Sequence, residues 1–141
     1  FCGYNMGDYF AHWLKIGASA PDKSTLPKIF YVNWFRKGAS GKFLWPGFGD
    51  NIRVLAWIAG RLRGSGEARD TAIGRVPASQ ALDLSGLSIA DDDLVALLAV
   101  DREEWSAEYP RIVEHYARYG DRTPAALQGQ LHALHLRLSN S

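Results

Sequence analysis

Apolar residues recur at helical spacing in five parts of this chain, so the sequence predicts about five helices. The first lies in GDYFAHWLKIGA, with Asp8 as the expected N-cap, and a loop is predicted over residues 17–25. The second covers residues 50–63, where Gly64 marks the expected end. Its apolar stripe consists of Ile52, Leu55, Ile58, Ala59 and Leu62.

The C-terminal third carries the other three predicted helices. SIADDDLVALLAV has acidic residues in its first turn, where they suit the helix dipole. REEWSAEYPRIVEHYARYG follows, and Pro110 predicts a kink or a break within it. In the last helix Thr123 is the expected N-cap, with Pro124 at the first helical position. The apolar seam of that helix consists of Leu127, Leu131, Leu134 and Leu138.

Strand-forming residues cluster in KIFYVNWF, so we predict a strand over residues 28–35. Its nearly continuous apolarity is typical of a strand buried on both faces. The turn RKGASGK and the short segment FLW would close a hairpin-like excursion. TAIGRVP could form another short strand. The pattern as a whole indicates a mixed α/β fold with a few short strands and about five helices.

Composition and charge narrow the class of protein. The chain has 141 residues, 47% of them hydrophobic, and a net charge of +1, which gives no general case for a nucleic-acid or membrane partner. No apolar run approaches the roughly 20 residues needed to span a bilayer, and no signal peptide is visible. The single cysteine, Cys2, excludes an internal disulfide and favours a reducing, cytoplasmic location. The opening FCGYNMGDYF lacks an initiator methionine, which we interpret as a chain cut from a longer one.

Aromatic residues are concentrated in one glycine-rich segment. Nearly half of them lie between Phe30 and Trp57, many within WFRKGASGKFLWPGFGDN. A planar nucleobase would suit such a cluster, because stacking on a ring is worth roughly 1–3 kcal/mol per base. Asn51 could read the edge of the base, since its amide offers both a donor and an acceptor. Alternatively, the rings fasten a loop to the core and Asn51 caps a helix. The pattern alone leaves both interpretations open.

Other candidate sites carry weaker signals. GASGK at residues 38–42 lacks the full spacing of a phosphate loop, so a plain turn is predicted. His132 and His135 lie three residues apart on a predicted helix, with no third ligand nearby. We therefore assign no catalytic residue and no metal ligand within this chain.

The segment LPKIFYVNWFRKGASGKFLWPGFGDNIRVLAWI strongly resembles the nucleotide-binding segment of the GTP-dependent phosphoenolpyruvate carboxykinases. GYNMGDYFAHWLKI resembles the helix before it, and TAIGRVPASQALDLSGL with the helical tail resembles the rest of that C-terminus. The resemblance implies the C-terminal part of the carboxykinase nucleotide-binding domain. Residues 1–63 would be the guanine-nucleotide-binding segment, residues 64–88 connecting loops, and residues 89–141 the helical tail of the same domain.

The resemblance also implies a site. Phe35, Phe43 and Phe48 match the three phenylalanines of the guanine pocket, and Asn51 matches the asparagine that contacts the base. Trp34 flanks this pocket and would support it. Phe1 matches a phenylalanine that lines the oxaloacetate pocket. Cys2 departs from the aromatic residue of relatives, which puts the local packing there in doubt.

The implied activity is that of a lyase of gluconeogenesis, a decarboxylase that converts oxaloacetate and GTP to phosphoenolpyruvate, GDP and carbon dioxide. The intact enzyme would use Mn²⁺ and Mg²⁺, with ligands outside this chain, and would be a monomer that binds neither nucleic acid nor membrane. The phosphate loop, the metal ligands and the substrate-binding arginines lie N-terminal to this segment in relatives. The chain alone is therefore predicted to be inactive. The alternative is a stand-alone purine-nucleotide-binding module without catalysis.

Overall fold

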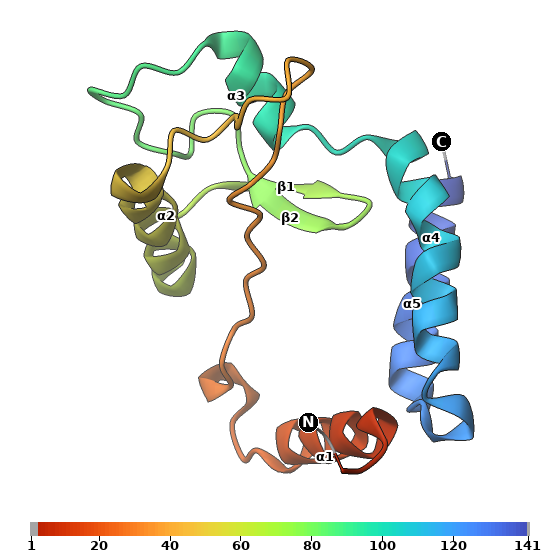
Figure 1. Ribbon diagram of the computed structural model, residues 1–141. Coiled ribbons are helices and arrows are strands. Elements are labelled where there is room, and N and C mark those ends of the chain that lie inside the picture. The colour runs from red at the N-terminus through yellow and green to blue at the C-terminus, as the bar shows by residue number, and fades with distance from the viewer. Residues whose placement is uncertain (1–2, 141) are drawn as a thin grey trace. The chain divides into compact units, whose positions relative to one another are not determined.

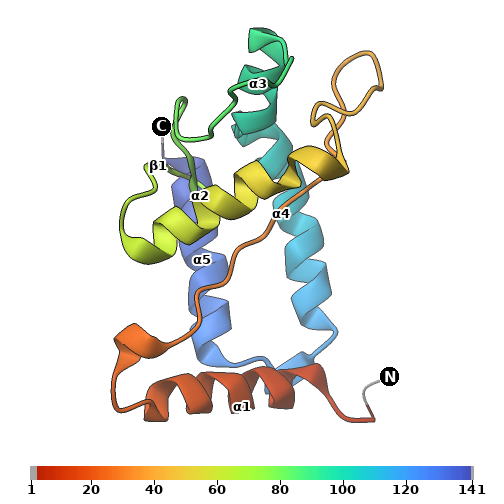
Figure 2. The ribbon, with the colours of Figure 1, turned by 90° about the vertical axis from the view of Figure 1, so that its left-hand side faces the viewer.

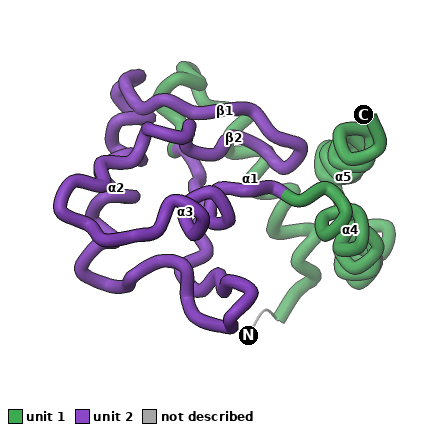
Figure 3. Tube along the Cα trace, turned by 90° about the horizontal axis from the view of Figure 1, so that it is seen from above, with its two compact units in different colours: residues 1–27, 101–141 green, residues 28–100 purple. Residues whose placement is uncertain are grey.

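The computed structural model describes residues 3–140 and divides the chain into two compact units, coloured separately in Figure 3. Unit 1 comprises residues up to 27 together with residues from 101 onward, and unit 2 comprises residues 28–100. Five α-helices and a two-stranded antiparallel sheet make up the regular structure of the described residues, which confirms the mixed α/β class. None of the helices within residues 3–140 combines the length and the apolarity that crossing a membrane requires.

Unit 1 is helical. In chain order its elements are α1 (Met6–Ser19), η1 (Lys23–Thr25), α4 (Arg102–Ala117), η3 (Gly120–Arg122) and α5 (Ala125–Ser139). Helices α4 and α5 lie side by side, joined through η3 (Figures 1 and 2). The predicted leucine seam faces inward, because Leu131 and Leu138 are buried while Leu127 and Leu134 are half-buried. Burial of this seam is what holds the helix in place.

The start of α1 differs from the prediction. Asn5, not Asp8, is the N-cap, and its side-chain oxygen accepts a hydrogen bond of 2.7 Å from the Gly7 amide. Asp8 lies in the first turn instead, where it pairs with Arg122 at 2.5 Å. The helix also continues to Ser19, so the predicted loop over residues 17–25 begins too early. Asparagine and aspartate cap helices about equally well, so sequence alone did not separate the two.

Two predictions concern the C-terminal helices. The predicted alternatives at Pro110 were a kink or a break, and the break is wrong because α4 continues through Pro110 to Ala117. Packing of α4 along α5 outweighs the backbone hydrogen bond that the proline removes. Helix α5 begins one residue later than predicted, with Pro124 at the N-cap position. The Thr123 hydroxyl donates to carbonyl oxygens of the preceding turn rather than capping α5.

Unit 2 contains one hairpin and two helices. Its elements are η2 (Phe48–Asp50), α2 (Asn51–Arg63), β1 (Ala68–Thr71), β2 (Gly74–Pro77) and α3 (Asp91–Leu98). Helix α2 ends as predicted at Gly64, whose φ of +82° is accessible to glycine at little cost. Strands β1 and β2 pair antiparallel with Ala68 opposite Pro77, so the strand considered in TAIGRVP is half of a hairpin (Figure 1). The buried apolar side chains of this unit are Leu44, Trp45 and Leu82.

The strand predicted over residues 28–35 is wrong. This segment has no regular secondary structure, and Ile29 and Tyr31 are each 96% exposed. A strand needs a neighbour to accept its backbone hydrogen bonds, and within residues 3–140 no strand pairs with this segment. The expected hairpin-like excursion is reduced to a single antiparallel bridge between Lys37 and Phe43.

Helix α2 has the predicted apolar stripe, but the stripe is only partly covered, because Ile58 and Ala59 alone are half-buried. Ile52 is 64% exposed, and Leu55 and Leu62 are exposed as well. The opposite side of the helix is the more buried one, with Gly60 and Trp57 turned toward the rest of unit 2. Hydrophobic periodicity thus identified the helix correctly, but it did not identify which side of the helix packs against the rest of unit 2.

Gly7 and Gly17 provide a test of packing within unit 1. A Cβ atom on Gly7 would lie 2.5 Å from the Arg122 carbonyl oxygen, whereas one on Gly17 would meet only Leu26, at 4.0 Å. We expect Gly7→Ala to lower the free energy of unfolding by about 1–3 kcal/mol, because backbone blocks the new methyl group. Gly17→Ala, the matched control in the same helix, should raise it by about 0.5–1 kcal/mol. Urea unfolding of the two variants measures both values, and equal effects would contradict this packing.

Candidate functional site

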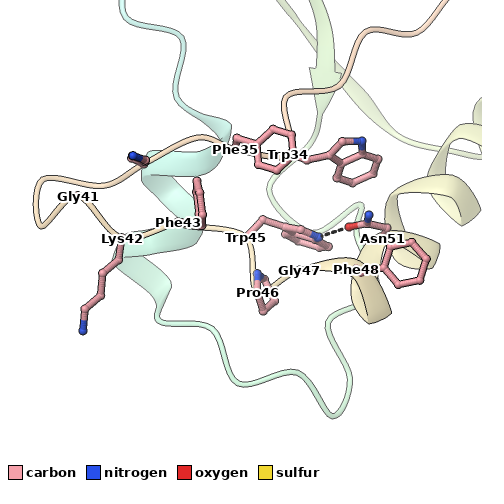
Figure 4. Close-up of a pocket in the computed structure, with 11 residues that line it drawn as sticks. Trp34, Phe35, Gly41, Lys42, Phe43, Trp45, Pro46, Gly47, Phe48 and Asn51 are labelled. Atoms are coloured by element: carbon pink, nitrogen blue, oxygen red, sulfur yellow. Dashed lines mark hydrogen bonds between the residues drawn. The ribbon is translucent and has the colours of Figure 1, made fainter.

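A cavity of about 780 Å³ opens in unit 2 (Figure 4). Its lining residues are Trp34, Phe35, Lys37, Gly41, Lys42, Phe43, Trp45, Pro46, Gly47, Phe48 and Asn51. The structure therefore brings together five of the residues singled out from the sequence: Trp34, Phe35, Phe43, Phe48 and Asn51. The sixth, Phe1, lies outside the described residues.

Backbone hydrogen bonds shape the first wall of the cavity. The Leu44 amide donates to the Arg36 carbonyl at 2.9 Å, and the Gly38 amide donates to the Lys42 carbonyl at the same distance. These bonds close the turn that carries Phe43 back beside Phe35. The Gly38 and Gly41 amides both donate within the turn, so they are not free to cradle a phosphate.

Side chains on either side of Phe35 fix that stretch of the loop. The Asn33 side-chain oxygen accepts a hydrogen bond of 3.0 Å from the Phe35 amide. The Arg36 guanidinium donates to the Leu97 and Ala99 carbonyl oxygens, at 3.0 and 2.8 Å. These oxygens belong to the C-terminal end of α3, where a cation is favourable. The guanidinium therefore fastens the loop to a helix.

The three phenylalanines remain open to solvent. The Phe35 and Phe43 rings meet edge to face with their centroids 5.9 Å apart, and they are 71% and 56% exposed. Phe48 is 94% exposed and lies beside Asn51, with Trp45 between it and Phe43 (Figure 4). Gly47, with φ of +124°, adopts a backbone conformation that favours glycine and changes the direction of the chain just before Phe48.

Trp45 is the ring of this segment that fastens the loop to the core. It is only 4% exposed, and its neighbour Leu44 is 7% exposed. The alternative interpretation of the aromatic cluster, rings that merely attach a loop, thus describes Trp45. It does not describe the three phenylalanines, whose faces are available to a flat ligand.

Asn51 is the first residue of α2 and lines the cavity. It does not cap the helix, because Asp50 occupies the N-cap position. Its side-chain oxygen accepts a hydrogen bond of 2.9 Å from the Trp45 indole nitrogen (Figure 4). This contact was not predicted, since nothing in the sequence indicates where an indole N–H points.

Arg53 holds the beginning of α2 in place. Its guanidinium pairs with Asp50 at 3.0 Å and donates to the Asp83 and Ser85 carbonyl oxygens at 2.7 and 2.9 Å. The Asp83 carboxylate accepts hydrogen bonds from the Ser85 hydroxyl and amide, which, with the nearby Arg53 charge, lower the pKa of Asp83. These contacts join the loop of residues 83–85 to the first turn of α2, which contains Asn51.

The charges that line the cavity are positive. Lys37 and Lys42 both contribute to the wall, and the Lys37 ammonium lies 5.4 Å from the centre of the Phe43 ring. Basic side chains at the mouth of a cavity favour an anionic ligand. Across residues 3–140, no group of three histidine, cysteine, aspartate or glutamate side chains is placed to hold a metal ion. The site is therefore suited to a flat anionic ligand.

Comparisons with known proteins point to one family. A family model described as "Phosphoenolpyruvate carboxykinase C-terminal P-loop domain" matches residues 1–137. Proteins named "Phosphoenolpyruvate carboxykinase [GTP]" are similar over nearly the whole chain. Those from Arthrobacter sp. (strain FB24) and Treponema pallidum (strain Nichols) are 49% identical over 140 and 142 residues, and that from Neocallimastix frontalis is 50% identical over 139. The matches include 98–100% of this chain but only 22–23% of these relatives. The chain thus spans less than a quarter of their length.

Proposed function

Since this chain belongs to the family of GTP-dependent phosphoenolpyruvate carboxykinases, we propose that it supplies the guanine-binding pocket of such an enzyme. One observation carries the proposal: the exposed rings of Phe35, Phe43 and Phe48 line a single cavity that also contains Asn51. These are the residues that the family resemblance assigns to the base. Trp34 lines the same cavity and would support it.

The phenylalanines and the amide have different tasks in this pocket. Stacking on an aromatic ring accepts any base, because every base has a π-face. Selection of guanine requires a polar group directed at the edge of the base, and Asn51 provides one. Lys37 and Lys42 add positive charge that suits the phosphates of a nucleotide. Affinity would therefore come from the rings and the lysines, and discrimination from the amide.

We further propose that the protein containing this chain converts oxaloacetate and GTP to phosphoenolpyruvate, GDP and carbon dioxide in the cytoplasm, as a monomer. A bound base would fix the position of the nucleotide, so that its terminal phosphate is presented to the acceptor in the same orientation at each turnover. Mn²⁺ and Mg²⁺, which would stabilise negative charge, would take their ligands from the part of the full-length protein outside this chain. Contact with oxaloacetate through Phe1 remains part of the proposal.

The exposed apolar surface of unit 2 supports the view that this chain works inside a longer protein. Ile29 and Tyr31 are almost fully exposed, and Ile52, Leu55 and Leu62 of the α2 stripe are exposed as well. Water-exposed apolar surface of this kind is usually covered by another part of a protein. The rest of a full-length carboxykinase is a suitable cover, because this chain spans less than a quarter of its relatives.

The first test changes the amide. In the full-length protein we expect Asn51→Leu to lower the preference for GTP over ATP about tenfold, because the base edge loses its polar partner. Binding of each nucleotide measured by calorimetry gives the ratio. A preference that does not change would mean that the backbone, not Asn51, selects the base.

The second test removes a stacking ring. Phe48→Ala should weaken GTP and ATP alike by about 1–3 kcal/mol, because stacking does not distinguish the bases. Tyr31→Ala is the control, since it removes a ring of similar size that does not line the cavity. Loss of affinity in the control and not in Phe48→Ala would contradict the proposed pocket.

The third test separates the enzyme from the alternative, a stand-alone purine-binding module. The 141 residues alone should give no decarboxylation of oxaloacetate and no transfer of phosphate from GTP, because they span less than a quarter of their relatives and would lack the rest of the active site. A coupled assay compares the isolated chain with the full-length protein at equal concentration. Turnover by the isolated chain would refute the proposal that the catalytic groups lie elsewhere in the full-length protein. Absence of turnover in both the isolated chain and the full-length protein would favour the purine-binding module.

A further inference from the structure

We infer that Trp45 is a positioning residue that sets the base preference of the pocket by fixing the orientation of the Asn51 amide. The inference rests on the proposed function and goes beyond it, because it assigns the selectivity to a hydrogen bond within the protein. That bond joins the Trp45 indole nitrogen and the Asn51 side-chain oxygen at 2.9 Å.

The chemistry of the indole decides which end of the amide it contacts. An indole nitrogen carries a hydrogen and only donates, so the atom facing it must be the amide oxygen. Turning the amide by half a rotation would place its NH₂ group against the indole N–H, donor against donor. Trp45 therefore stabilises one of the two orientations of Asn51 and disfavours the other.

The indole is itself held in place. Trp45 is 4% exposed, and its neighbour Leu44 is both buried and bonded through its amide to Arg36. A donor on a largely buried ring interacts more strongly than one in water. On the other side, α2 and the Arg53 contacts fix the backbone of Asn51. Both partners of the hydrogen bond thus have fixed positions.

The favoured orientation leaves the NH₂ group of Asn51 for the ligand. Among residues 3–140 this group donates to no acceptor, and Asn51 lines the cavity. A donor at the base edge suits a purine with a carbonyl oxygen at position 6, such as guanine. Adenine carries an amino group there, which is also a donor. The buried indole therefore favours 6-oxopurines over 6-aminopurines through the amide that it orients.

The test is the change Trp45→Phe in the full-length protein, with GTP and ATP binding measured by calorimetry. We expect the GTP-to-ATP affinity ratio to fall roughly threefold to tenfold, the worth of one hydrogen bond. Trp57→Phe is the matched control. The Trp57 indole nitrogen donates a hydrogen bond of 2.8 Å to the Glu67 carbonyl oxygen, and Trp57 does not line the cavity. This control should leave the ratio unchanged. A general loosening of the fold would weaken both nucleotides and would not move the ratio.

Two further measurements keep the test decisive. Trp45→benzothienylalanine retains the shape of the indole without its N–H, so it should lower the ratio even if phenylalanine packs poorly. In an Asn51→Leu background, Trp45→Phe should change the ratio no further, because the amide it orients is gone. A ratio unaltered by both changes at Trp45, in a protein that does prefer GTP, would overturn this inference alone. A wild-type protein without preference for GTP would overturn the proposed function itself.

Discussion

Burial of Trp45 is the constraint on which the candidate site depends. The indole packs the loop of residues 34–48 against the rest of unit 2, while the phenylalanines around it stay exposed. Its N–H also reaches the first residue of α2 and meets the Asn51 oxygen. One side chain thus shapes the cavity and orients the polar group at its edge. A loop rich in glycine would otherwise have too many conformations to hold three rings around one space.

The exposed apolar groups of this chain fall into two kinds with different physical roles. The exposed rings that line the cavity lie near the positive charges of Lys37 and Lys42, as suits a flat ligand that binds transiently. Ile29, Tyr31 and the exposed part of the α2 stripe do not line that cavity, as suits a permanent protein contact. The second kind accords with a chain that spans less than a quarter of its relatives. The proposed guanine pocket would place nucleotide selection in one segment of such a longer protein.

Sequence patterns predicted the helices well because a helix satisfies its own backbone. The leucine seam of α5 and the end of α2 at Gly64 needed only local information. The strand over residues 28–35 failed for the opposite reason, since a strand needs a partner that periodicity does not supply. The candidate site residues came from aromatic clustering and family resemblance, and the structure groups Phe35, Phe43, Phe48 and Asn51 around one cavity. Trp45 was missed because its role depends on a hydrogen bond between side chains, which no spacing rule encodes.

The central claim is that a guanine base occupies this cavity. A crystal structure of the full-length protein with bound GDP tests it most directly. The account predicts a base stacked among the rings of Phe35, Phe43 and Phe48, with its 6-oxo group accepting a hydrogen bond from the Asn51 NH₂ group. A base bound elsewhere, or one whose edge faces away from Asn51, would contradict it.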